Sequence, residues 1–299
     1  MTQPLVSIII PTYSRPENLC RAIESVLAQT YHPIEIIVVD DNGLGTPFQE
    51  ETERKLTEYI RNGQITYIKH KVNKNGSAAR NTGFHASKGD FIGFLDDDDI
   101  FATTKIEEQV ERLMECPKEY GACYCNSIIC NPKRTFHTHN AKEGNLCYEL
   151  LTLNALFNTS TILFRHKALA DIHGWDERFA RHQDWELMVR FFRKHKICIT
   201  DPKSYLVKKF ATANAITKDP LRSIEYRHFF LQEIRKDIES LPYPQKVYKA
   251  QIEDLSLGLM RSGAKKEGRK QFLGIFRYGF PSWTGLAKYF YYLFFKKQS

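Results

Sequence analysis

The chain has 299 residues, of which 42% are hydrophobic, so it can bury a substantial core in one large domain with an appendage or in two domains. Its net charge of +8 is compatible with a nucleic acid, an anionic membrane or a phosphorylated small molecule as partner. A nucleic acid is not expected, because no basic and aromatic module of that class is present. No apolar run approaches the ~20 residues of a membrane-spanning helix.

The seven cysteines are irregularly spaced and form no C-x-x-C pair, which disfavours a zinc site and favours ordinary buried thiols. The N-terminal segment, MTQPLVSIIIPTYSRPE, lacks the cationic start and the long apolar run of a signal peptide. A cytoplasmic location is therefore expected, because thiols stay reduced in that compartment.

Strands and helices alternate over the first hundred residues. Short runs rich in Val and Ile, such as LVSIIIP, predict buried strands, and apolar residues at helical spacing, as in PENLCRAIESVLAQT, predict helices. This alternation predicts the α/β class, with a mostly parallel, Rossmann-like sheet that carries helices on both faces. The predicted strands span residues 5–11, 34–42, 65–70 and 91–95, and the predicted helices span 16–30, 47–61 and 76–87.

The rhythm changes after residue 103. From about residue 218 the sequence predicts helices, with breaks near Pro242 and Gly263. Between these points we expect helices at 103–114 and 183–195, strands at 120–130 and 158–166, and an edge strand at 204–210. The predicted domains are residues 1–215, divided into halves 1–100 and 101–215, and a helical extension at 216–299.

Polar residues follow three of the predicted strands, at the carboxyl ends where ligands gather in parallel sheets. Four adjacent carboxylates repel one another, and a divalent cation such as Mn²⁺ or Mg²⁺ would relieve that repulsion. A solvated acidic turn or a helix N-terminus is the alternative explanation for them. The strand ends are Pro11-Thr12-Tyr13, Asp40-Asp41 and the four consecutive aspartates Asp96 to Asp99, of which Asp96 and Asp98 are the candidate metal ligands.

The turn after the first strand, PTYSRPE, lacks the G-x-G-x-x-G fingerprint, and no Walker motif is present, so a nucleotide would be bound in another way. Asp40 or Asp41 could accept a hydrogen bond from a base or a ribose hydroxyl. The Tyr13 ring could lie against the base, and Arg80 could bind phosphate oxygens bidentately. For the two aspartates, a plain turn in the segment DDNGLG is the alternative.

Asp184 shares one face of the predicted helix 183–195 with Leu187, Met188 and Phe191, at spacings i, i+3, i+4 and i+7. An acid thus occupies the first turn of an otherwise apolar, inward face, where the helix dipole and burial have opposite effects on its charge. This arrangement favours a general base that stays ionised. The alternative is an N-terminal acid that only complements the helix dipole.

Three blocks of the sequence resemble the family-two glycosyltransferases of the GT-A fold: VSIIIPTYSRPENLCRAIESVLAQTYHPIEIIVVDDN, NGSAARNTGFHASKGDFIGFLDDDD and GWDERFARHQDWELMVR. The resemblance is dense over residues 5–100 and returns at 158–192. It implies an inverting transferase that uses a nucleotide sugar, most often a UDP-sugar, together with Mn²⁺ or Mg²⁺.

The resemblance also implies roles for individual residues. Asp184 matches the catalytic base, and its neighbour Gln183 departs from the family's usual Glu-Asp pair. Asp97 is more acidic than the residue usual at its position and is expected to face solvent. The implied nucleotide-binding residues are Pro11, Thr12, Tyr13, Arg15, Asp40, Asp41, Arg80, Asp96 and Asp97, and the implied metal ligands are Asp96 and Asp98.

The second half of the chain is expected to bind the acceptor. Trp175 could stack on a sugar ring, with core packing as the alternative, and His182 could contact the acceptor, with a surface position as the alternative. The aromatic tail, WTGLAKYFYYLFFKKQS, could contact a membrane interface, pack on the main domain, or pack on a second subunit in a homodimer.

The expected function is metal-dependent transfer of a hexosyl or N-acetylhexosaminyl group to a hydroxyl of a glycan or a lipid-linked acceptor, as in the synthesis of surface polysaccharide, capsule or lipopolysaccharide. A nucleotidyltransferase that makes the nucleotide sugar is one alternative, but it would need a glycine-rich loop with Arg and Lys after the first strand. A non-catalytic nucleotide-sugar-binding protein is the other, and it would not need Asp184 or the metal-binding acids, all of which are present.

Overall fold

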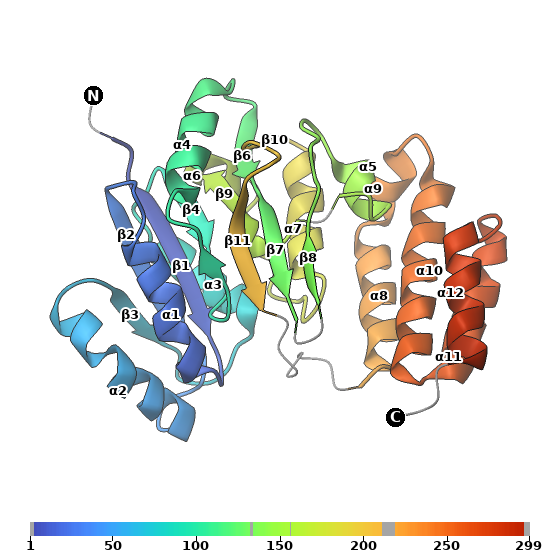
Figure 1. The fold of residues 1–299 in the computed structure, drawn as a ribbon, viewed down its shortest axis with the longest axis horizontal. Helices are drawn as coiled ribbons and strands as arrows, with labels where there is room; N and C mark the ends of the chain where they lie inside the picture. The colour runs from blue at the N-terminus through green and yellow to red at the C-terminus, as the bar shows by residue number, and fades with distance from the viewer. Residues whose placement is uncertain (1–2, 132–133, 156, 211–218, 296–299) are drawn as a thin grey trace. The chain divides into compact units, whose positions relative to one another are not determined.

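The computed structural model describes residues 3–131, 134–155, 157–210 and 219–295 (Figure 1). Contacts within the chain divide it into two compact units. The first unit combines Met1–Leu146 with Leu156–Thr212, and the second combines Cys147–Ala155 with Ala213–Ser299. The predicted domain boundary at residues 215 and 216 lies outside the described residues.

A seven-stranded sheet, ordered β10-β6-β9-β4-β1-β2-β3, forms the centre of the first unit (Figure 1). β1 pairs in parallel with β2 and with β4, whereas β9 runs antiparallel to its neighbours β4 and β6. The prediction of a mostly parallel α/β sheet is therefore confirmed. The strands of this sheet are β1 (Val6–Thr12), β2 (Ile34–Asp40), β3 (Thr66–Lys69), β4 (Phe91–Phe94), β6 (Tyr120–Tyr124), β9 (Ile162–Arg165) and β10 (Lys196–Ile199).

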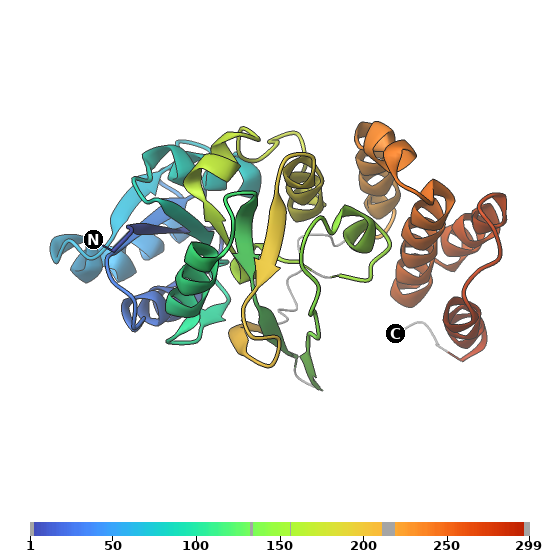
Figure 2. The same ribbon diagram turned by 90° about the horizontal axis from the view of Figure 1, so that it is seen from above.

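Helices cover both faces of this sheet (Figure 2). On one face, α1, α2 and α4 bury side chains such as Ile23 and Val110 against strand residues such as Ile8. On the other face lie α3, α6 and α7, where Phe191 packs edge-to-face on Phe164 of β9. The helices are α1 (Pro16–Leu27), α2 (Pro47–Arg61), α3 (Gly76–Ala86), α4 (Lys105–Glu115), α6 (His166–Ala170) and α7 (Gln183–Phe192).

A glycine brings α3 unusually close to the central strand β1. A Cβ atom added at Gly83 would lie 2.3 Å from Cγ2 of Ile9, well inside the separation at which two carbon atoms attract. Because any larger residue would push the helix outward, Gly83 fixes the distance between α3 and β1. This matters for the functional site, since α3 carries Arg80.

A second sheet, ordered β5-β11-β7-β8, corrects two predictions. The predicted strand 120–130 is interrupted at Cys125, whose N–H donates to the carbonyl of Thr161, so β6 joins the large sheet and β7 joins the small one. The predicted edge strand 204–210 is internal, because β11 pairs with both β5 and β7. The strands are β5 (Ile100–Phe101), β7 (Asn126–Cys130), β8 (Thr135–His137) and β11 (Tyr205–Phe210).

Helices make up the second unit over its described residues. The predicted breaks near Pro242 and Gly263 are confirmed, because α10 begins at Pro244 and ends at Ser262, directly before Gly263, whose φ of 96° favours glycine. Residues 147–155, predicted in the first domain, belong here: Nε2 of the buried Gln251 donates to the carbonyl of Leu151. The elements are α5 (Cys147–Leu151), α8 (Arg222–Glu233), α9 (Arg235–Ser240), α10 (Pro244–Ser262), α11 (Lys265–Gly274), η2 (Ile275–Arg277) and α12 (Trp283–Phe294).

Over the parts of the chain that the structure describes, none of the helices is at once long enough and apolar enough to cross a membrane. The longest of them, α10, carries charged residues along its length, such as Lys246, Glu253 and Asp254.

Lys105, at the start of α4, is fully buried in the core of the first unit. Its Nζ donates to Oε1 of Gln109 over 2.6 Å and lies 4.0 Å from the centroid of the Phe101 ring. Burial disfavours the charged ammonium group and lowers the pKa of Lys105 to about 8, from an ordinary value of 10.5.

This buried lysine should make stability depend on pH. Between about pH 8 and 10 the unfolded chain holds a proton that the folded chain has lost, so the free energy of unfolding should rise with pH, with a slope approaching about 1 kcal/mol per pH unit from this residue. In Lys105→Met that part of the slope should disappear. Urea unfolding of both proteins across this range checks the prediction, and identical slopes would contradict it.

Candidate active site

The predicted strand ends meet at one edge of the large sheet. Thr12 at the end of β1 is in register with Asp40 at the end of β2, and Leu95, directly after β4, donates its N–H to the carbonyl of Ile9 in β1. The segment Asp96–Asp99 therefore leaves the sheet beside the turn that follows β1. Parallel sheets bind their ligands at this edge.

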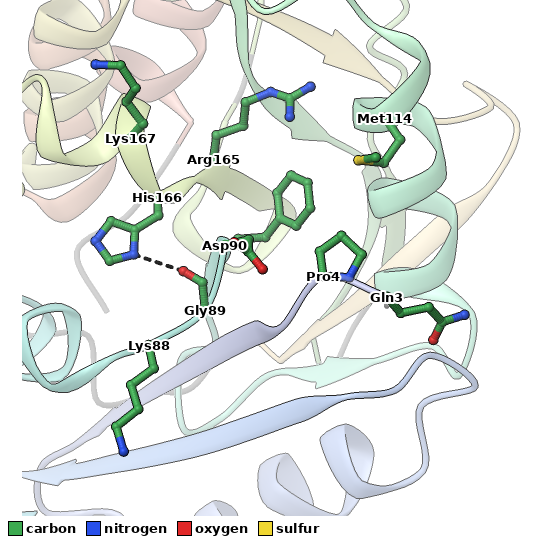
Figure 3. Close-up of a pocket in the computed structure, with 10 residues that line it drawn as sticks. Gln3, Pro4, Lys88, Gly89, Asp90, Met114, Arg165, His166 and Lys167 are labelled. Atoms are coloured by element: carbon green, nitrogen blue, oxygen red, sulfur yellow. Dashed lines mark hydrogen bonds between the residues drawn. The ribbon is translucent and has the colours of Figure 1, made fainter. Parts of the chain in front are cut away.

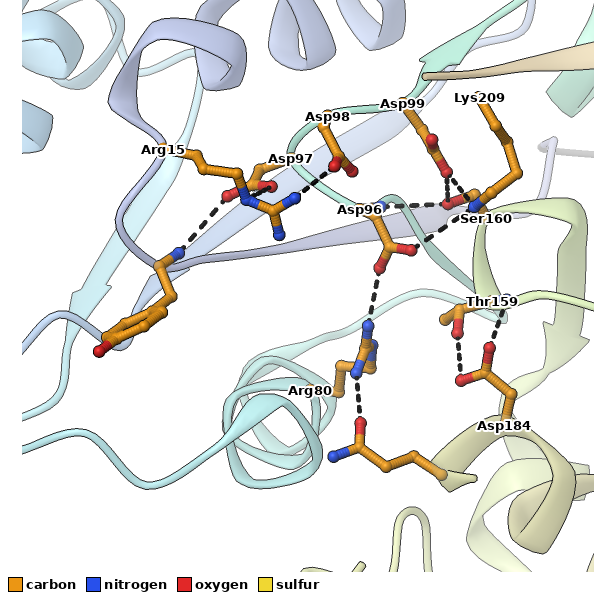
Figure 4. Close-up of polar contacts among 12 residues, drawn as sticks. Arg15, Arg80, Asp96, Asp97, Asp98, Asp99, Thr159, Ser160, Asp184 and Lys209 are labelled. Carbon is orange, nitrogen blue, oxygen red and sulfur yellow. Dashed lines mark hydrogen bonds and ion pairs between the residues drawn. The ribbon is translucent and has the colours of Figure 1, made fainter. Parts of the chain in front are cut away.

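Each of the four aspartates contacts a side chain from another part of the chain (Figure 4). Two of them accept hydrogen bonds from hydroxyl groups: Asp97 from Oγ1 of Thr12 over 2.9 Å, and Asp99 from Oγ of Ser160 over 2.6 Å. Three basic residues supply the opposite charge. The ion pairs join Arg15 to Asp97 and Asp98, Arg80 to Asp96 at 2.7 Å, and Lys209 to Asp99 at 2.6 Å and to Asp96 at 3.7 Å.

Asp97 is buried, which corrects the expectation that it faces solvent. Besides Thr12, the N–H of Tyr13 and Nε of Arg15 approach its carboxylate, at 3.4 and 3.1 Å. Burial raises the pKa of Asp97 to about 7, although the charge of Arg15 opposes this shift. Asp97 thus holds the turn after β1 against the end of β4 and presents no exposed oxygen to the nucleotide that it was predicted to bind.

Asp99 is the second buried acid of the cluster. Burial raises the pKa of Asp99 to about 6, against the effect of the neighbouring Lys209. For Asp96 the balance differs: burial acts to raise its pKa, but the charges of Arg80, Lys209 and Arg15 outweigh burial and lower it. Asp96 is therefore the more strongly ionised of the two.

Asp96 and Asp98 keep 28% and 13% of their side-chain surfaces exposed, and they turn to different basic partners (Figure 4). Their carboxylates suit Mg²⁺ or Mn²⁺, hard cations that keep water and phosphate oxygens as further ligands. Across the described residues, three or more His, Cys, Asp or Glu side chains nowhere gather as a metal site. Asp96 and Asp98 are the residues of this edge that could hold such a cation together with a phosphate group.

A short 3₁₀ helix, η1 (Thr159–Thr161), connects the aspartate cluster to Asp184. Ser160 accepts from the N–H of Asp96 over 3.2 Å and donates to Asp99. The preceding residue, Thr159, donates from Oγ1 to Oδ1 of Asp184 over 2.7 Å. Asp184 lies in the first turn of α7 and is partly buried, as predicted. One turn of chain therefore positions both sets of acids.

Arg80 bridges the same two groups from α3. It donates from Nη2 to Asp96 and from Nη1 to Oε1 of Gln183 over 3.1 Å. The amide of Gln183 in turn donates from Nε2 to the carbonyl of Phe179 over 2.8 Å. A glutamate at position 183 could not make that last bond, because an ionised carboxylate only accepts. The departure from the usual Glu-Asp pair therefore has a local structural reason.

Trp175 belongs to the core, which is the alternative to stacking on an acceptor sugar. Its relative exposure is 4%, and its ring packs edge-to-face on Phe94 with the centroids 5.5 Å apart. The guanidinium of Arg80 lies 4.8 Å from the centroid of the ring, so Trp175 supports Arg80. His182 stacks on Trp185 with centroids 5.0 Å apart, and its contact with an acceptor stays a prediction.

Asp40 and Asp41 are buried and bind groups of the protein, and their contact with a base or a ribose stays a prediction. Asp40 accepts from the hydroxyl of Tyr67 and from the backbone and side chain of Asn42, and burial raises its pKa. Asp41 organises the segment before α3 and thereby the position of Arg80. Its carboxylate accepts from Nδ2 of Asn73 and from the N–H groups of Lys74 and Asn75, at 2.8–2.9 Å, and lies 2.7 Å from Nδ1 of His70.

Tyr13 is the predicted nucleotide-binding residue with the most open side chain, with a relative exposure of 52%. Its ring is therefore available to stack on a base. Pro11 is partly buried and Thr12 is buried, so these two residues are less accessible than Tyr13. Arg15 faces the acids rather than solvent alone, since it pairs with Asp97 and Asp98.

Three residues of the site were not predicted from the sequence: Thr159, Ser160 and Lys209. Thr159 and Ser160 lie in the 3₁₀ helix η1 and Lys209 lies in β11. A hydroxyl or a lysine is ordinary in such segments, and each of the three reaches the site through tertiary contacts. The strand SYLVKKF did contain one signal, because Lys209 interrupts an alternation that would otherwise place an apolar residue there.

A separate cavity of about 700 Å³ lies at the opposite edge of the sheet (Figure 3). Residues 88–91 before and at the start of β4, and Arg165 at the end of β9, line it. The guanidinium of Arg165 is engaged by the carbonyls of Tyr120 and Leu113, and Nδ1 of His166 lies 2.9 Å from the carbonyl of Gly89. None of the predicted site residues is among those that line this cavity.

Comparisons with known proteins identify the family of this chain. The family model described as Glycosyl transferase family 2 matches residues 7–173, more than half of the chain. The uncharacterized glycosyltransferase RP339 of Rickettsia prowazekii (strain Madrid E) is 31% identical over 232 residues, which are 74% of this chain and 69% of that protein. The Escherichia coli protein named UDP-Glc:alpha-D-GlcNAc-diphosphoundecaprenol beta-1,3-glucosyltransferase WfaP is 37% identical over 125 residues, 42% of this chain and 47% of that one.

Solved structures share the fold. Staphylococcus aureus TarS 1-349 in complex with UDP-GlcNAc aligns with a TM-score of 0.63 at 14% identity, over 96% of this chain and 91% of that chain. The mannosyltransferase PcManGT of Pyrobaculum calidifontis, in complex with GDP-Man and Mn²⁺, aligns with a TM-score of 0.58 at 16% identity, over 99% of this chain and 89% of that one. Among the first sequence relatives, the chain spans between 28% and 75% of the relative's own length.

Asp41→Asn should destabilise the first unit, because the amide offers one acceptor oxygen and an NH₂ group to a site built from N–H donors. At least one buried donor would lose its partner, at a cost of about 2–3 kcal/mol in the free energy of unfolding. Asp201→Asn is the matched control, since Asp201 accepts from the N–H of Lys203 in an exposed loop. Urea unfolding checks both variants, and equal stability of the two would contradict this role of Asp41.

Proposed function

Because this chain belongs to glycosyltransferase family 2 and is a glycosyltransferase, we propose that it moves a hexosyl or N-acetylhexosaminyl group from a nucleotide sugar, a UDP-sugar by preference, to a hydroxyl of a glycan or a lipid-linked acceptor. The observation that carries the proposal is the junction at η1, where neighbouring residues bind Asp184 and the aspartate cluster. A base for the acceptor and a charge cluster for the donor thus lie in one continuous site. The family match argues against both a nucleotidyltransferase and a non-catalytic binding protein.

The choice of donor and acceptor is supported by the relatives. WfaP is named for a UDP-Glc donor and a diphosphoundecaprenol-linked acceptor, and TarS was solved with UDP-GlcNAc. PcManGT was solved with GDP-Man and Mn²⁺, so a related fold also accepts a different base. We propose a UDP-sugar such as UDP-Glc or UDP-GlcNAc as the donor of this chain, and a lipid-linked acceptor. The product would serve the synthesis of a surface polysaccharide.

Asp184 is the residue that we assign to the acceptor. Its carboxylate would take the proton of the acceptor hydroxyl as that oxygen attacks the anomeric carbon. Thr159 donates from Oγ1 to Oδ1 of Asp184 over 2.7 Å and from its N–H to Oδ2 over 3.4 Å, and these two bonds fix the orientation of the carboxylate. One base and one displacement invert the anomeric configuration, and no carboxylate nucleophile is required.

The opposite half of the site would bind the donor diphosphate. Asp96 and Asp98 would hold Mn²⁺ or Mg²⁺, which offsets the negative charge of the departing nucleoside diphosphate. Arg15 and Arg80 are paired with aspartates in this structure, and each guanidinium can exchange a carboxylate for a phosphate oxygen, because both anions fit its donor geometry. Tyr13 would stack on the base.

The place of the reaction follows from the acceptor. A lipid-linked acceptor lies at a membrane surface, so we include a peripheral membrane contact in the proposal. No disulfide joins cysteines within the described residues, which supports the expected cytoplasmic location. A homodimer stays a prediction.

Asp184→Asn should keep donor binding but lose at least ~100-fold in turnover, the scale of a general-base contribution. Nucleotide release in the presence of an acceptor that supports turnover measures the rate, and calorimetry measures the binding of the donor. Asp171→Asn is the control, because Asp171 pairs with Lys167 on the surface at the far end of β9. Turnover near that of the unaltered protein would remove Asp184 from the mechanism.

Asp98→Ala should weaken binding of UDP in the presence of Mn²⁺ by at least about tenfold, because one of the two carboxylates that hold the cation is lost. Titration calorimetry with and without a chelator measures this effect. A separate assay measures the release of UDP, GDP or dTDP from the corresponding nucleotide sugars, with and without a chelator, and identifies the donor. Unchanged UDP affinity in Asp98→Ala, or turnover that ignores the chelator, would count against the metal-dependent mechanism.

A further inference from the structure

Helix α12 presents its apolar side chains to solvent, the reverse of an ordinary helix on a protein surface. Trp283, Ala287, Phe290 and Phe294 follow one another at i, i+4, i+7 and i+11, so they share one face, and all four are exposed. The relative exposure is 88% for Trp283 and 70% for Phe294. A surface helix of a globular protein would carry charged residues along this face.

The opposite face of α12 fixes the helix to its own unit. The Tyr289 ring stacks on Phe272 of α11 with the centroids 3.9 Å apart. Ser282, which caps the helix, donates its backbone N–H to Oε2 of Glu253 in α10 over 2.9 Å. Figure 1 shows α10, α11 and α12 side by side. These contacts determine which face of α12 points inward, and the aromatic face therefore points outward.

Further exposed apolar side chains lie just before α12. The rings of Phe276 and Phe280 contact each other with centroids 5.7 Å apart, and Leu273 precedes them at the end of α11. So many exposed apolar side chains on one small unit indicate a surface that binds a membrane or another molecule. We define the aromatic surface as the exposed residues Leu273, Phe276, Phe280, Trp283, Phe290, Tyr291, Phe294 and Phe295.

Positive charge accompanies the aromatic surface. Between residues 263 and 295 the chain has six basic residues and one acidic residue, Glu267, a net charge of +5. The basic residues are Lys265, Lys266, Arg269, Lys270, Arg277 and Lys288, and of these Lys265 alone is partly buried among the described residues. More than half of the protein's net charge of +8 is therefore concentrated in this segment.

We propose that the aromatic surface is a docking surface for an anionic lipid bilayer, in which the aromatic side chains enter the headgroup region and the surrounding Lys and Arg contact lipid phosphates. Trp and Tyr favour this interface because their rings are apolar and their N–H and O–H groups are polar. Each basic residue near an anionic leaflet adds to the attraction. The inference deepens the proposed function and rests on it for one point, that the acceptor is attached to a lipid.

A bilayer fits the surface better than a second copy of the chain does. Two copies that met through this surface would bring two segments of charge +5 together, and like charges across an interface are unfavourable. An anionic leaflet supplies the opposite charge over the whole area and also accepts aromatic side chains at varied depth. The charge pattern therefore selects lipid as the occupant.

Flotation of the full chain with vesicles tests the proposal. The protein should float with vesicles of phosphatidylcholine that contain about one third phosphatidylglycerol, should stay at the bottom with pure phosphatidylcholine, and should detach as salt is raised. A variant with Phe280, Trp283, Phe290 and Phe294 each replaced by Ser should partition at least about tenfold less. Lys266→Glu with Arg269→Glu and Lys270→Glu should lose the preference for anionic lipid.

Leu44→Ser with Phe48→Ser is the matched control, because these apolar residues are exposed in the first unit and lie outside the aromatic surface. This variant should float like the unaltered protein. Circular dichroism verifies that each variant is folded. Equal flotation with both lipid mixtures, or flotation that survives the four aromatic replacements, would overturn the proposal. A dimer in light scattering that becomes a monomer in the aromatic variant, without flotation of either protein, would also overturn it in favour of a second copy.

The same proteins separate this inference from the proposed function. Binding of UDP by calorimetry, without vesicles, involves the first unit and should be unchanged in the aromatic variant. If the unaltered protein floats but binds no nucleotide, the membrane surface stands and the proposed function fails. If it binds UDP and turns over a soluble acceptor but never floats, the proposed function stands and the membrane surface fails.

Discussion

Repulsion among four consecutive carboxylates is the constraint around which the site is built. Two unit charges 4 Å apart repel by about 4 kcal/mol at the effective dielectric constant of a protein surface. Asp96–Asp99 places four carboxyl groups at one strand end, where burial also raises the pKa of Asp97 and of Asp99. Arg15, Arg80 and Lys209 offset this charge, and they come from the turn after β1, from α3 and from β11. The cluster thus draws three elements together. The exposed carboxylates of the cluster could also release a basic side chain and bind a different cation in its place.

Hydroxyl groups and buried acids then give this cluster its shape. Ser160 joins Asp96 to Asp99, and Thr159 beside it binds Asp184, so the distance between the two halves of the site is set by adjacent residues on one short turn. Asp41 also fixes a part of the site, because it accepts hydrogen bonds from the N–H groups of the two residues that precede α3. Rigid neighbours of this kind hold a reactive geometry more precisely than long loops do.

Both units bury an apolar core, but the second unit also leaves a set of aromatic side chains exposed. In the first unit the sheet buries its apolar strands between helices, and a lysine, Lys105, is enclosed with them. In the second unit α12 uses Tyr289 and Gly285 to dock and leaves larger rings such as Trp283 and Phe294 outside. Covering these exposed rings would remove apolar surface from water and so lower the free energy.

The local sequence was enough to predict the α/β class, the helix at 47–61 and the meeting of the strand ends, because periodicity and strand direction depend on near neighbours. It also located Asp184 in the first turn of its helix. Tertiary structure alone decided that the segment 120–130 divides between two sheets, that Trp175 lies under Arg80, and that Asp40, Asp41 and Asp97 are buried acceptors within the protein. Burial and hydrogen-bond partners come from residues far apart in the chain, as with Thr12 and Asp97, and no local pattern contains that information.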